Sequence, residues 1–249
     1  MKLFLIDAYA LIYRSYYAFI KNPRINSKGV NTSAIFGFIN SLEDVLKREN
    51  PTHIAVAFDP KGPTFRHEAF EQYKAQREET PEVIRQSVPI IKEIIEAYNI
   101  PILEVPRYEA DDVIGTLAKK AEDSGVHTYI LTGDRDSLQL LSDSVSVILT
   151  KTKEDILYTP ERFNEEYGIS PSQFVDVKAL MGDSSDNIPG VAGIGEKTAL
   201  KLIASVSSLD ALYSDISACG ASAGICAKLE AGRDSAFLSR TLAQICRSV

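Results

Sequence analysis

Nine carboxylates of this 249-residue chain gather in short clusters, and most of them directly follow apolar runs typical of β-strands. Asp7 follows the run 2–6, and Asp59 follows the run 53–58. In an open parallel α/β sheet, ligands bind at the carboxyl ends of the strands. Acids that meet there would repel one another, and a divalent cation relieves the repulsion; oxygen-only ligands favour Mg²⁺ or Mn²⁺. The predicted metal ligands are Asp7, Asp59, Glu109, Asp111, Asp112, Asp134, Asp136, Asp183 and Asp186.

The elements that position these acids follow from the spacing of apolar residues. The strand candidates are residues 2–6, 53–58, 100–105, 127–131 and 145–150. Helical spacing covers residues 33–49, 81–98 and 110–123, and the pattern is helical throughout from about residue 160. Because strands and helices alternate over the first part of the chain, we expect a parallel α/β sheet flanked by helices, followed by a helical region.

Composition leaves a nucleic-acid partner open. The net charge of −7 at first argues against one, but without the nine clustered acids it becomes about +2. The three cysteines have no metal-finger spacing, which is typical of reduced thiols in a cytosolic protein. The apolar start is interrupted by Asp7 and has no cleavage site, so no signal peptide is predicted. No stretch approaches the ~18 apolar residues of a membrane helix.

Three acid motifs also have ordinary structural explanations. Glu109, Asp111 and Asp112 precede an apolar helix face, where a single acid would serve as a cap. Three acids exceed what capping needs, so metal contact is favoured there. The motifs Gly133-Asp134-Arg135-Asp136 and Gly182-Asp183-Ser184-Ser185-Asp186-Asn187 could, taken alone, be Asx turns.

Residues 61–85 mix cations with aromatic side chains. If the segment is helical, one face would carry Arg66, Phe70, Tyr73, Lys74 and Arg77. Such a face suits a single nucleic-acid strand, through phosphate pairing and base stacking. The alternative is a solvated charged face, because the segment also contains Glu68, Glu71, Glu78 and Glu79.

A glycine-rich turn opens onto a helix at residues 190–199. Gly190, Gly193 and Gly195 would let backbone N–H groups approach an anion, and Lys197 and Thr198 begin the helix. No strand precedes the turn, so the dinucleotide-binding fingerprint does not apply. A phosphate-gripping hairpin fits better than the alternative, a plain turn between helices.

Together these motifs resemble the 5′-nuclease domains of bacterial DNA polymerase I, within the flap endonuclease family. The blocks occur in the family's order over roughly residues 1–204, whereas residues 205–249 match only loosely. The matching blocks are Phe4-Leu5-Ile6-Asp7, Ala57-Phe58-Asp59, Phe65-Arg66, Tyr73-Lys74-Ala75-Gln76-Arg77, Tyr108-Glu109-Ala110-Asp111-Asp112, the two motifs that begin at Gly133 and Gly182, and Gly190 to Ala199.

The resemblance implies a fold and a set of residue roles. The fold would be a PIN-like or resolvase-like nuclease core over residues 1–160 and a helical subdomain over 161–249. A helical arch would span about 66–92, with a helix-hairpin-helix at about 187–204. Arg66 and Lys74 would contact the scissile region, and Tyr73 would stack on a base. Two Mg²⁺ or Mn²⁺ ions would be bound, the first by Asp7, Asp59, Glu109, Asp111 and Asp112, and the second by the remaining four acids.

The implied function is metal-dependent 5′-3′ exonuclease and flap endonuclease activity in DNA replication and repair, including removal of Okazaki primers. The substrates would be DNA with 5′ flaps, nicks or 5′ ends. The hairpin would grip duplex DNA and could hold K⁺. A polymerase domain could be attached to a monomeric protein of the bacterial cytoplasm. The alternatives are a PIN-type ribonuclease, in which such a hairpin is not expected, and a non-catalytic DNA-junction binder, in which some of the acids would be lost.

Overall fold

A six-stranded sheet organises the first part of the chain in the computed structural model, which describes residues 1–151 and 154–249. The strands are β1 (Lys2–Asp7), β2 (His53–Ala57), β3 (Ile102–Leu103), β4 (His127–Thr132), β5 (Val145–Leu149) and β6 (Ile156–Tyr158). The sheet order is β3-β2-β1-β4-β5-β6, and only the β5–β6 pair is antiparallel. The expected parallel α/β sheet is therefore confirmed, and β6 is an edge strand that the sequence patterns do not predict.

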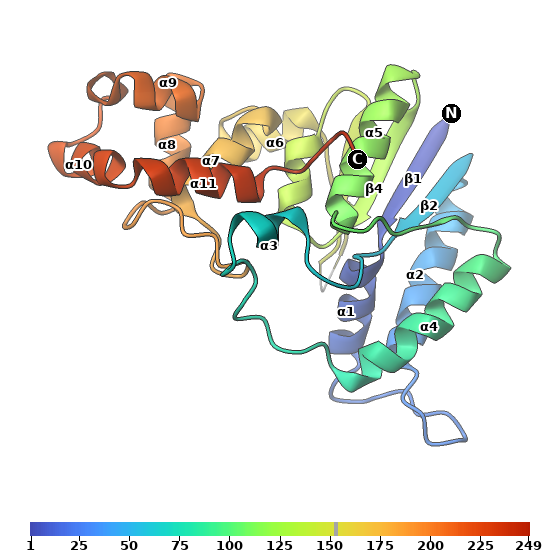
Figure 1. Cartoon of the computed structure of the whole chain (residues 1–249). Helices are drawn as coiled ribbons and strands as arrows, with labels where there is room; N and C mark the ends of the chain where they lie inside the picture. The colour runs from blue at the N-terminus through green and yellow to red at the C-terminus, as the bar shows by residue number, and fades with distance from the viewer. Residues whose placement is uncertain (152–153) are drawn as a thin grey trace.

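Helices cover both faces of the sheet because successive strand residues point to opposite sides. On β1, Phe4 and Ile6 pack with one apolar cluster, while Leu5 packs with another. The first face is covered by α1 (Ala8–Ala18), α2 (Ser33–Glu49) and α4 (Glu82–Ala97), and the second by α5 (Ala110–Asp123) (Figure 1). The sheet is thus buried on both sides, and its carboxyl edge remains available for a site.

The second part of the chain is helical, as predicted. Its helices are α6 (Pro160–Tyr167), α7 (Phe174–Met181), α8 (Glu196–Val206), α9 (Leu209–Ser214), α10 (Ala223–Ala231) and α11 (Arg233–Ala243). The described residues also contain the 3₁₀ helices η2 (Pro171–Gln173) and η3 (Ile216–Cys219) in this part and η1 (Arg135–Leu140) in the first part. Leu180 of α7 and Leu202 of α8 belong to the same apolar cluster as Leu5, so one core connects the helices with the sheet.

Two predicted elements differ from the structure. Residues 100–105 form only the two-residue strand β3, and Pro101 beside it has no N–H to donate to a sheet. The helical arch expected over about 66–92 contains two separate helices, because α3 (Phe65–Ala69) ends after five residues and a turn and loop lead to α4. Lys74 adopts a left-handed φ of 55°, which a helix does not allow.

No helix within residues 1–151 and 154–249 combines the length and the apolar character needed to cross a membrane.

Candidate functional site

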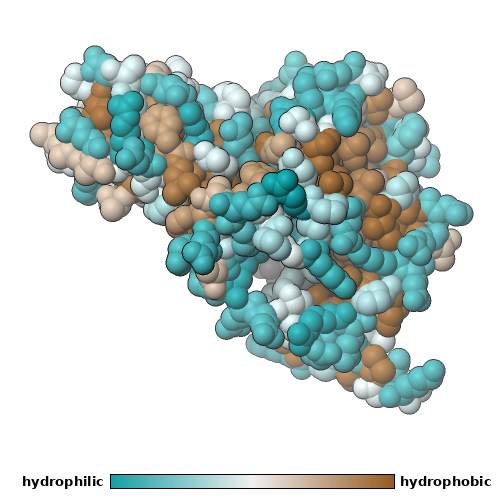
Figure 2. Space-filling model, in the orientation of Figure 1, coloured by the Kyte–Doolittle hydropathy of each residue, from teal (hydrophilic) through white to brown (hydrophobic). Residues whose placement is uncertain are grey.

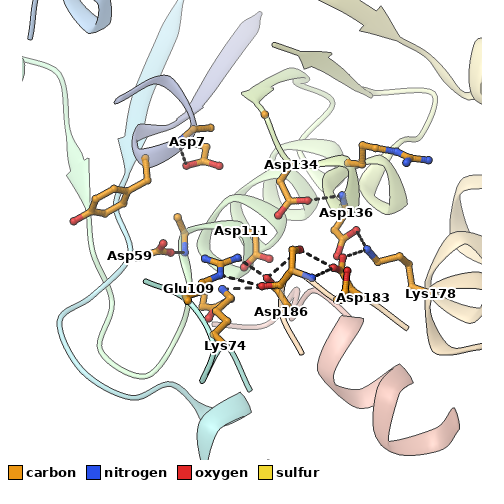
Figure 3. Close-up of a pocket in the computed structure, with 18 of the residues that line it drawn as sticks. Asp7, Asp59, Lys74, Glu109, Asp111, Asp134, Asp136, Lys178, Asp183 and Asp186 are labelled. Carbon is orange, nitrogen blue, oxygen red and sulfur yellow. Dashed lines mark hydrogen bonds and ion pairs between the residues drawn. The ribbon is translucent and has the colours of Figure 1, made fainter. Parts of the chain in front are cut away.

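A cleft of about 1130 Å³ opens at the carboxyl edge of the sheet, and it contains most of the predicted acids (Figure 3). It is bounded by the ends of β1, β2 and β4, the start of α5 and the turn after α7. The acids that line it are Asp7, Asp59, Glu109, Asp111, Asp134, Asp136, Asp183 and Asp186. Eight of the nine predicted metal ligands therefore share one cavity, although they come from five separate parts of the sequence.

Local structure fixes the first acids of the cleft. Asp7 ends β1 and caps α1, where its Oδ1 accepts a hydrogen bond from the Ala10 N–H at 3.1 Å. Its Oδ2 accepts from the Thr132 hydroxyl at 2.8 Å. Asp59 follows β2 and accepts from the Ala110 N–H at 2.7 Å, at the first turn of α5. The ends of β1, β2 and β4 and the N-termini of α1 and α5 are thereby joined through carboxylates.

Four cleft acids, named here the unpaired group, form no ion pair with a lysine, arginine or histidine in the described ranges. They are Asp7, Asp59, Asp111 and Asp134. Burial, reinforced by the charge of Asp59, raises the pKa of Asp7 to about 7. Burial also raises the pKa of each of the other three carboxyls. The negative charge of this group is therefore poorly compensated by the protein.

Three other acids, named here the paired group, meet cations of the chain itself: Asp136, Asp183 and Asp186. Lys178 lies 2.8 Å from Asp136 and also pairs with Asp183, while Arg77 pairs with Asp186. Burial alone would raise the pKa of Asp183, but hydrogen bonds from Lys178 and Ser185 bring it below its usual value. The pKa of Asp136 is still raised to about 7, first by burial and then by Asp134.

Lys74 lines the cleft beside its acids. Its ammonium group donates to Glu109 Oε2 at 2.8 Å and lies 3.8 Å from Asp186 Oδ2. Burial lowers the pKa of Lys74, but Glu109 and Asp186 more than compensate and raise it above its ordinary value. Lys74 therefore holds its charge at neutral pH.

Three expected roles do not agree with the structure. Arg66 is 1 % exposed and Asp112 is fully buried, and they pair with each other outside the cleft. Arg66 therefore does not face a scissile phosphate, and Asp112 has no free edge for a metal ion. Tyr73 is 3 % exposed and its hydroxyl donates to Glu109 at 3.0 Å, so its ring is not available for base stacking.

Sequence patterns missed Lys178 and two tyrosines. Lys178 occupies a buried position in α7, and a lone cation inside an apolar helical run was the signal that could have identified it. Tyr9 and Tyr13 of α1 also line the cleft. They follow Asp7 by two and six residues, which places them on the helix that starts at the site.

The donor set fits a hard divalent cation, although the side chains are not yet arranged around one. Within the described ranges, no three acidic, histidine or cysteine side chains form a ready coordination group. However, Asp111 Oδ1 is buried without a hydrogen-bond partner in those ranges, and the unpaired group has raised pKa values. Oxygen donors of this type suit Mg²⁺ or Mn²⁺.

The glycine hairpin lies between α7 and α8 and adjoins the cleft at Gly195. Gly190 has φ +61°, and a Cβ there would meet Gly182 N at 2.3 Å. Gly193 has φ +76° and lies against Lys228. Gly195 differs, because it has φ −99° and open space around it. Lys197 is exposed in the first turn of α8, and Thr198 is partly buried beside it. Gly190 and Gly193 therefore shape the hairpin, whereas Gly195 leaves it open to an incoming molecule.

Comparisons with known proteins agree with this geometry. Residues 2–168 match a family model described as 5′-3′ exonuclease, N-terminal resolvase-like domain, and residues 169–249 match one described as 5′-3′ exonuclease, C-terminal SAM fold. DNA polymerase I of Caldicellulosiruptor bescii is 45 % identical over 98 % of this chain and 29 % of its own length. DNA polymerase I of Bacillus subtilis is also 45 % identical, over 98 % of this chain and 28 % of its own length.

A solved structure shows the same fold. The bacteriophage T5 D15 flap endonuclease, crystallised with DNA and metal ions, superimposes with a TM-score of 0.78. The match covers 98 % of this chain and 89 % of that one, at 22 % identity.

Proposed function

Because the chain belongs to the 5′-3′ exonuclease family, we propose that its cleft hydrolyses phosphodiester bonds of DNA near 5′ ends, with divalent cations as cofactors. The observation that carries this proposal is the unpaired group: four carboxylates that line one cleft at the sheet edge and form no ion pair with cations of the described residues. The substrates would be flaps, nicks and duplex ends, since the T5 flap endonuclease of the same fold is described with DNA and metal ions.

Two ions, Mg²⁺ or Mn²⁺, would be held by two sets of acids. The first set is Asp7, Asp59, Glu109 and Asp111, and the second is Asp134, Asp136, Asp183 and Asp186. Asp112 is omitted because both of its oxygens are engaged inside the protein. When bound, such ions supply an activated water and neutralise charge on the phosphate.

Residues of the chain hold the Asp7 carboxylate in position and place positive charge in the cleft. Thr132 and the Ala10 N–H hold both oxygens of Asp7, so its carboxylate is fixed before substrate arrives. Lys74 is charged, partly buried and held over Glu109. A fixed cation at this place would stabilise charge that develops on a phosphate oxygen during cleavage. Arg77, half exposed and paired with Asp186, would contact the strand that enters the cleft.

The hairpin, which adjoins the cleft at Gly195, would grip a phosphate of the duplex. Its end at Gly195 is open, and the α8 N-terminus adds partial positive charge beside Lys197 and Thr198. Such contacts read the backbone and not the bases, so cleavage would depend on DNA structure and not on sequence. Occupation of the hairpin by K⁺ belongs to the same proposal.

The chain spans about 29 % of the length of the first curated relative that it matches, and 28 % of the next. The wider role is proposed from those relatives: primer removal and repair in the bacterial cytoplasm, by a monomeric nuclease connected to a polymerase. The boundary between a nuclease core over residues 1–160 and a helical subdomain over residues 161–249 is part of the same proposal.

The decisive experiment uses a 5′-labelled flap DNA with purified protein in excess chelator, then with Mg²⁺, Mn²⁺ or Ca²⁺. We expect short 5′ products only with Mg²⁺ or Mn²⁺, and binding without cleavage with Ca²⁺. A flap of the same sequence made of RNA throughout tests the ribonuclease alternative. Full cleavage in chelator would exclude the metal-dependent reaction, and binding without cleavage under every condition would favour a junction-binding protein.

A further inference from the structure

The last residues of the chain return to the start of α5, close to the cleft (Figure 1). After α11 ends, the Cys246 N–H donates to Asp112 Oδ1 at 2.8 Å, and the Val249 N–H donates to the Thr116 hydroxyl at 3.0 Å. The Ile245 N–H donates to the side chain of Gln139 in η1. The C-terminal segment is therefore bonded to α5 and η1, two of the elements that carry acids into the site.

Arg66 is the centre of this junction. Its guanidinium forms two parallel hydrogen bonds to Asp112, of 2.7 and 2.8 Å. Its Nε donates to the Leu242 carbonyl at 2.8 Å, and its Nη2 donates to the Gln244 carbonyl at 3.0 Å. A charge this deeply buried is tolerated only with such complete pairing. The guanidinium thus joins three segments that are far apart in the sequence: α3, α5 and the C-terminal segment.

The junction continues into the cleft through Glu109. Asp112 Oδ2 accepts the Glu109 N–H at 3.0 Å, so the position of Asp112 sets the backbone at which Glu109 begins α5. Glu109 in turn accepts from Lys74 at 2.8 Å and from Tyr73 at 3.0 Å. Asp111 lies between Glu109 and Asp112 on the same turn. A displacement of Asp112 would therefore move two cleft acids and the lysine above them.

We infer that Arg66, Asp112 and the segment 242–246 act as a latch that positions the first turn of α5, so that Glu109 and Asp111 face the metal site. Arg66 is in this view a positioning residue that touches neither metal nor DNA. The inference rests on the proposed function, since it assigns the latch to the metal-binding end of the cleft. It also explains why an arginine within the cation-rich segment 61–85 is buried when its neighbours Lys74 and Arg77 are not fully so.

The test compares two substitutions of one residue. Cys246→Pro removes the N–H that holds Asp112, whereas Cys246→Ala keeps it. A second pair is Arg66→Met and Arg107→Met, the latter an exposed arginine that pairs with Glu68 at the surface. Mn²⁺ binding to the DNA-free protein is measured by electron paramagnetic resonance of free Mn²⁺. Hydrogen exchange of the peptide that contains Glu109–Asp112 is measured in parallel.

We expect Mn²⁺ affinity to fall about tenfold in Arg66→Met and about threefold in Cys246→Pro, with faster exchange at residues 109–112 in both variants. The two controls should match the wild type. If Cys246→Pro had the Mn²⁺ affinity and the hydrogen exchange of the wild type, the latch would be overturned. The comparison of Cys246→Pro with Cys246→Ala provides the test if Arg66→Met does not fold. Unchanged Mn²⁺ binding but weaker flap-DNA binding in Arg66→Met would instead assign Arg66 to the substrate.

Failure of the proposed function would look different. If the wild type bound no Mn²⁺ and cleaved no flap, the metal-dependent function would be lost. Hydrogen exchange would then still report whether the segment 242–246 holds the first turn of α5: faster exchange in Cys246→Pro than in Cys246→Ala would support the latch, and equal exchange would overturn it.

Discussion

The unpaired and paired groups of carboxylates lie in one cleft, but their negative charge is compensated in different ways. Asp136, Asp183 and Asp186 form ion pairs with Lys178 and Arg77, which belong to the chain. The unpaired group has hydrogen bonds and burial but no cation, so its charge must be met from outside. The two ends of the cleft should therefore depend on an added cation to different degrees.

The largest difference is expected between two isosteric substitutions. Asp7→Asn removes an oxygen donor from the unpaired group, and we expect single-turnover cleavage of a 5′ flap to fall at least a thousandfold, about 4 kcal/mol. Asp183→Asn removes a charge that Lys178 already offsets, so a fall of about tenfold is expected, partly recovered at high Mg²⁺. Flap-DNA affinity in Ca²⁺ should stay within a few-fold for both. Equal losses would show that the two groups serve the reaction alike.

Lys74 lies where the two groups meet, and its removal should affect the chemical step. We expect Lys74→Ala to slow single-turnover cleavage, with an activation free energy raised by about 2.7–4 kcal/mol, because a preorganised donor to the transition state is lost. Lys61→Ala, at the cleft mouth, supplies a comparison for the loss of one positive charge. An effect on DNA affinity alone would place Lys74 among the binding residues.

The unpaired group should also make the metal-free protein less stable as pH rises. Folded Asp7 keeps its proton to about pH 7, whereas the unfolded carboxyl loses it near the ordinary value of 3.8. Between these values the folded state binds more protons, so the free energy of unfolding falls with increasing pH. Urea unfolding in chelator should show this fall, a shallower one in Asp7→Asn, and partial reversal by Mg²⁺. A stability that rises over the same range in the wild type relative to Asp7→Asn would contradict the raised pKa.

The smallest effect is expected at the hairpin, outside both groups. Gly195→Val should fold normally, because φ is −99° and no atom lies within 4 Å of an added Cβ. The side chain would instead obstruct a duplex phosphate. We expect weaker duplex binding with a log–log salt slope reduced by about 0.9 for each lost contact, and unchanged binding of a short single strand. An unchanged salt slope would make the hairpin a simple connector.

The sequence predicts the acids of the cleft well because strand and helix periodicity already places them at one sheet edge. The sequence does not predict the position of a side chain when contacts with distant parts of the chain determine it. Arg66 and Lys74 look alike within one charged segment, but only Arg66 meets Asp112 and the carbonyls of residues 242 and 244. Helical spacing would put Tyr73 and Lys74 on one exposed face, yet Lys74 is left-handed, Tyr73 is buried, and a turn replaces the helix there. Asp112 and the carbonyls of residues 242 and 244 lie too far from Arg66 in the sequence for periodicity to reveal these contacts.

The junction at Arg66 also sets an order on folding during synthesis. Arg66 and Leu242 are 176 residues apart, and Asp112 and Cys246 are 134 residues apart. Contacts with such separations form late, because chain closure must precede them. The sheet, α5 and every acid of the cleft can therefore emerge from the ribosome before the residues that close the junction. The nascent chain would remain without its assembled cleft, and thus without the proposed activity toward nearby DNA, until nearly all of these 249 residues had been made.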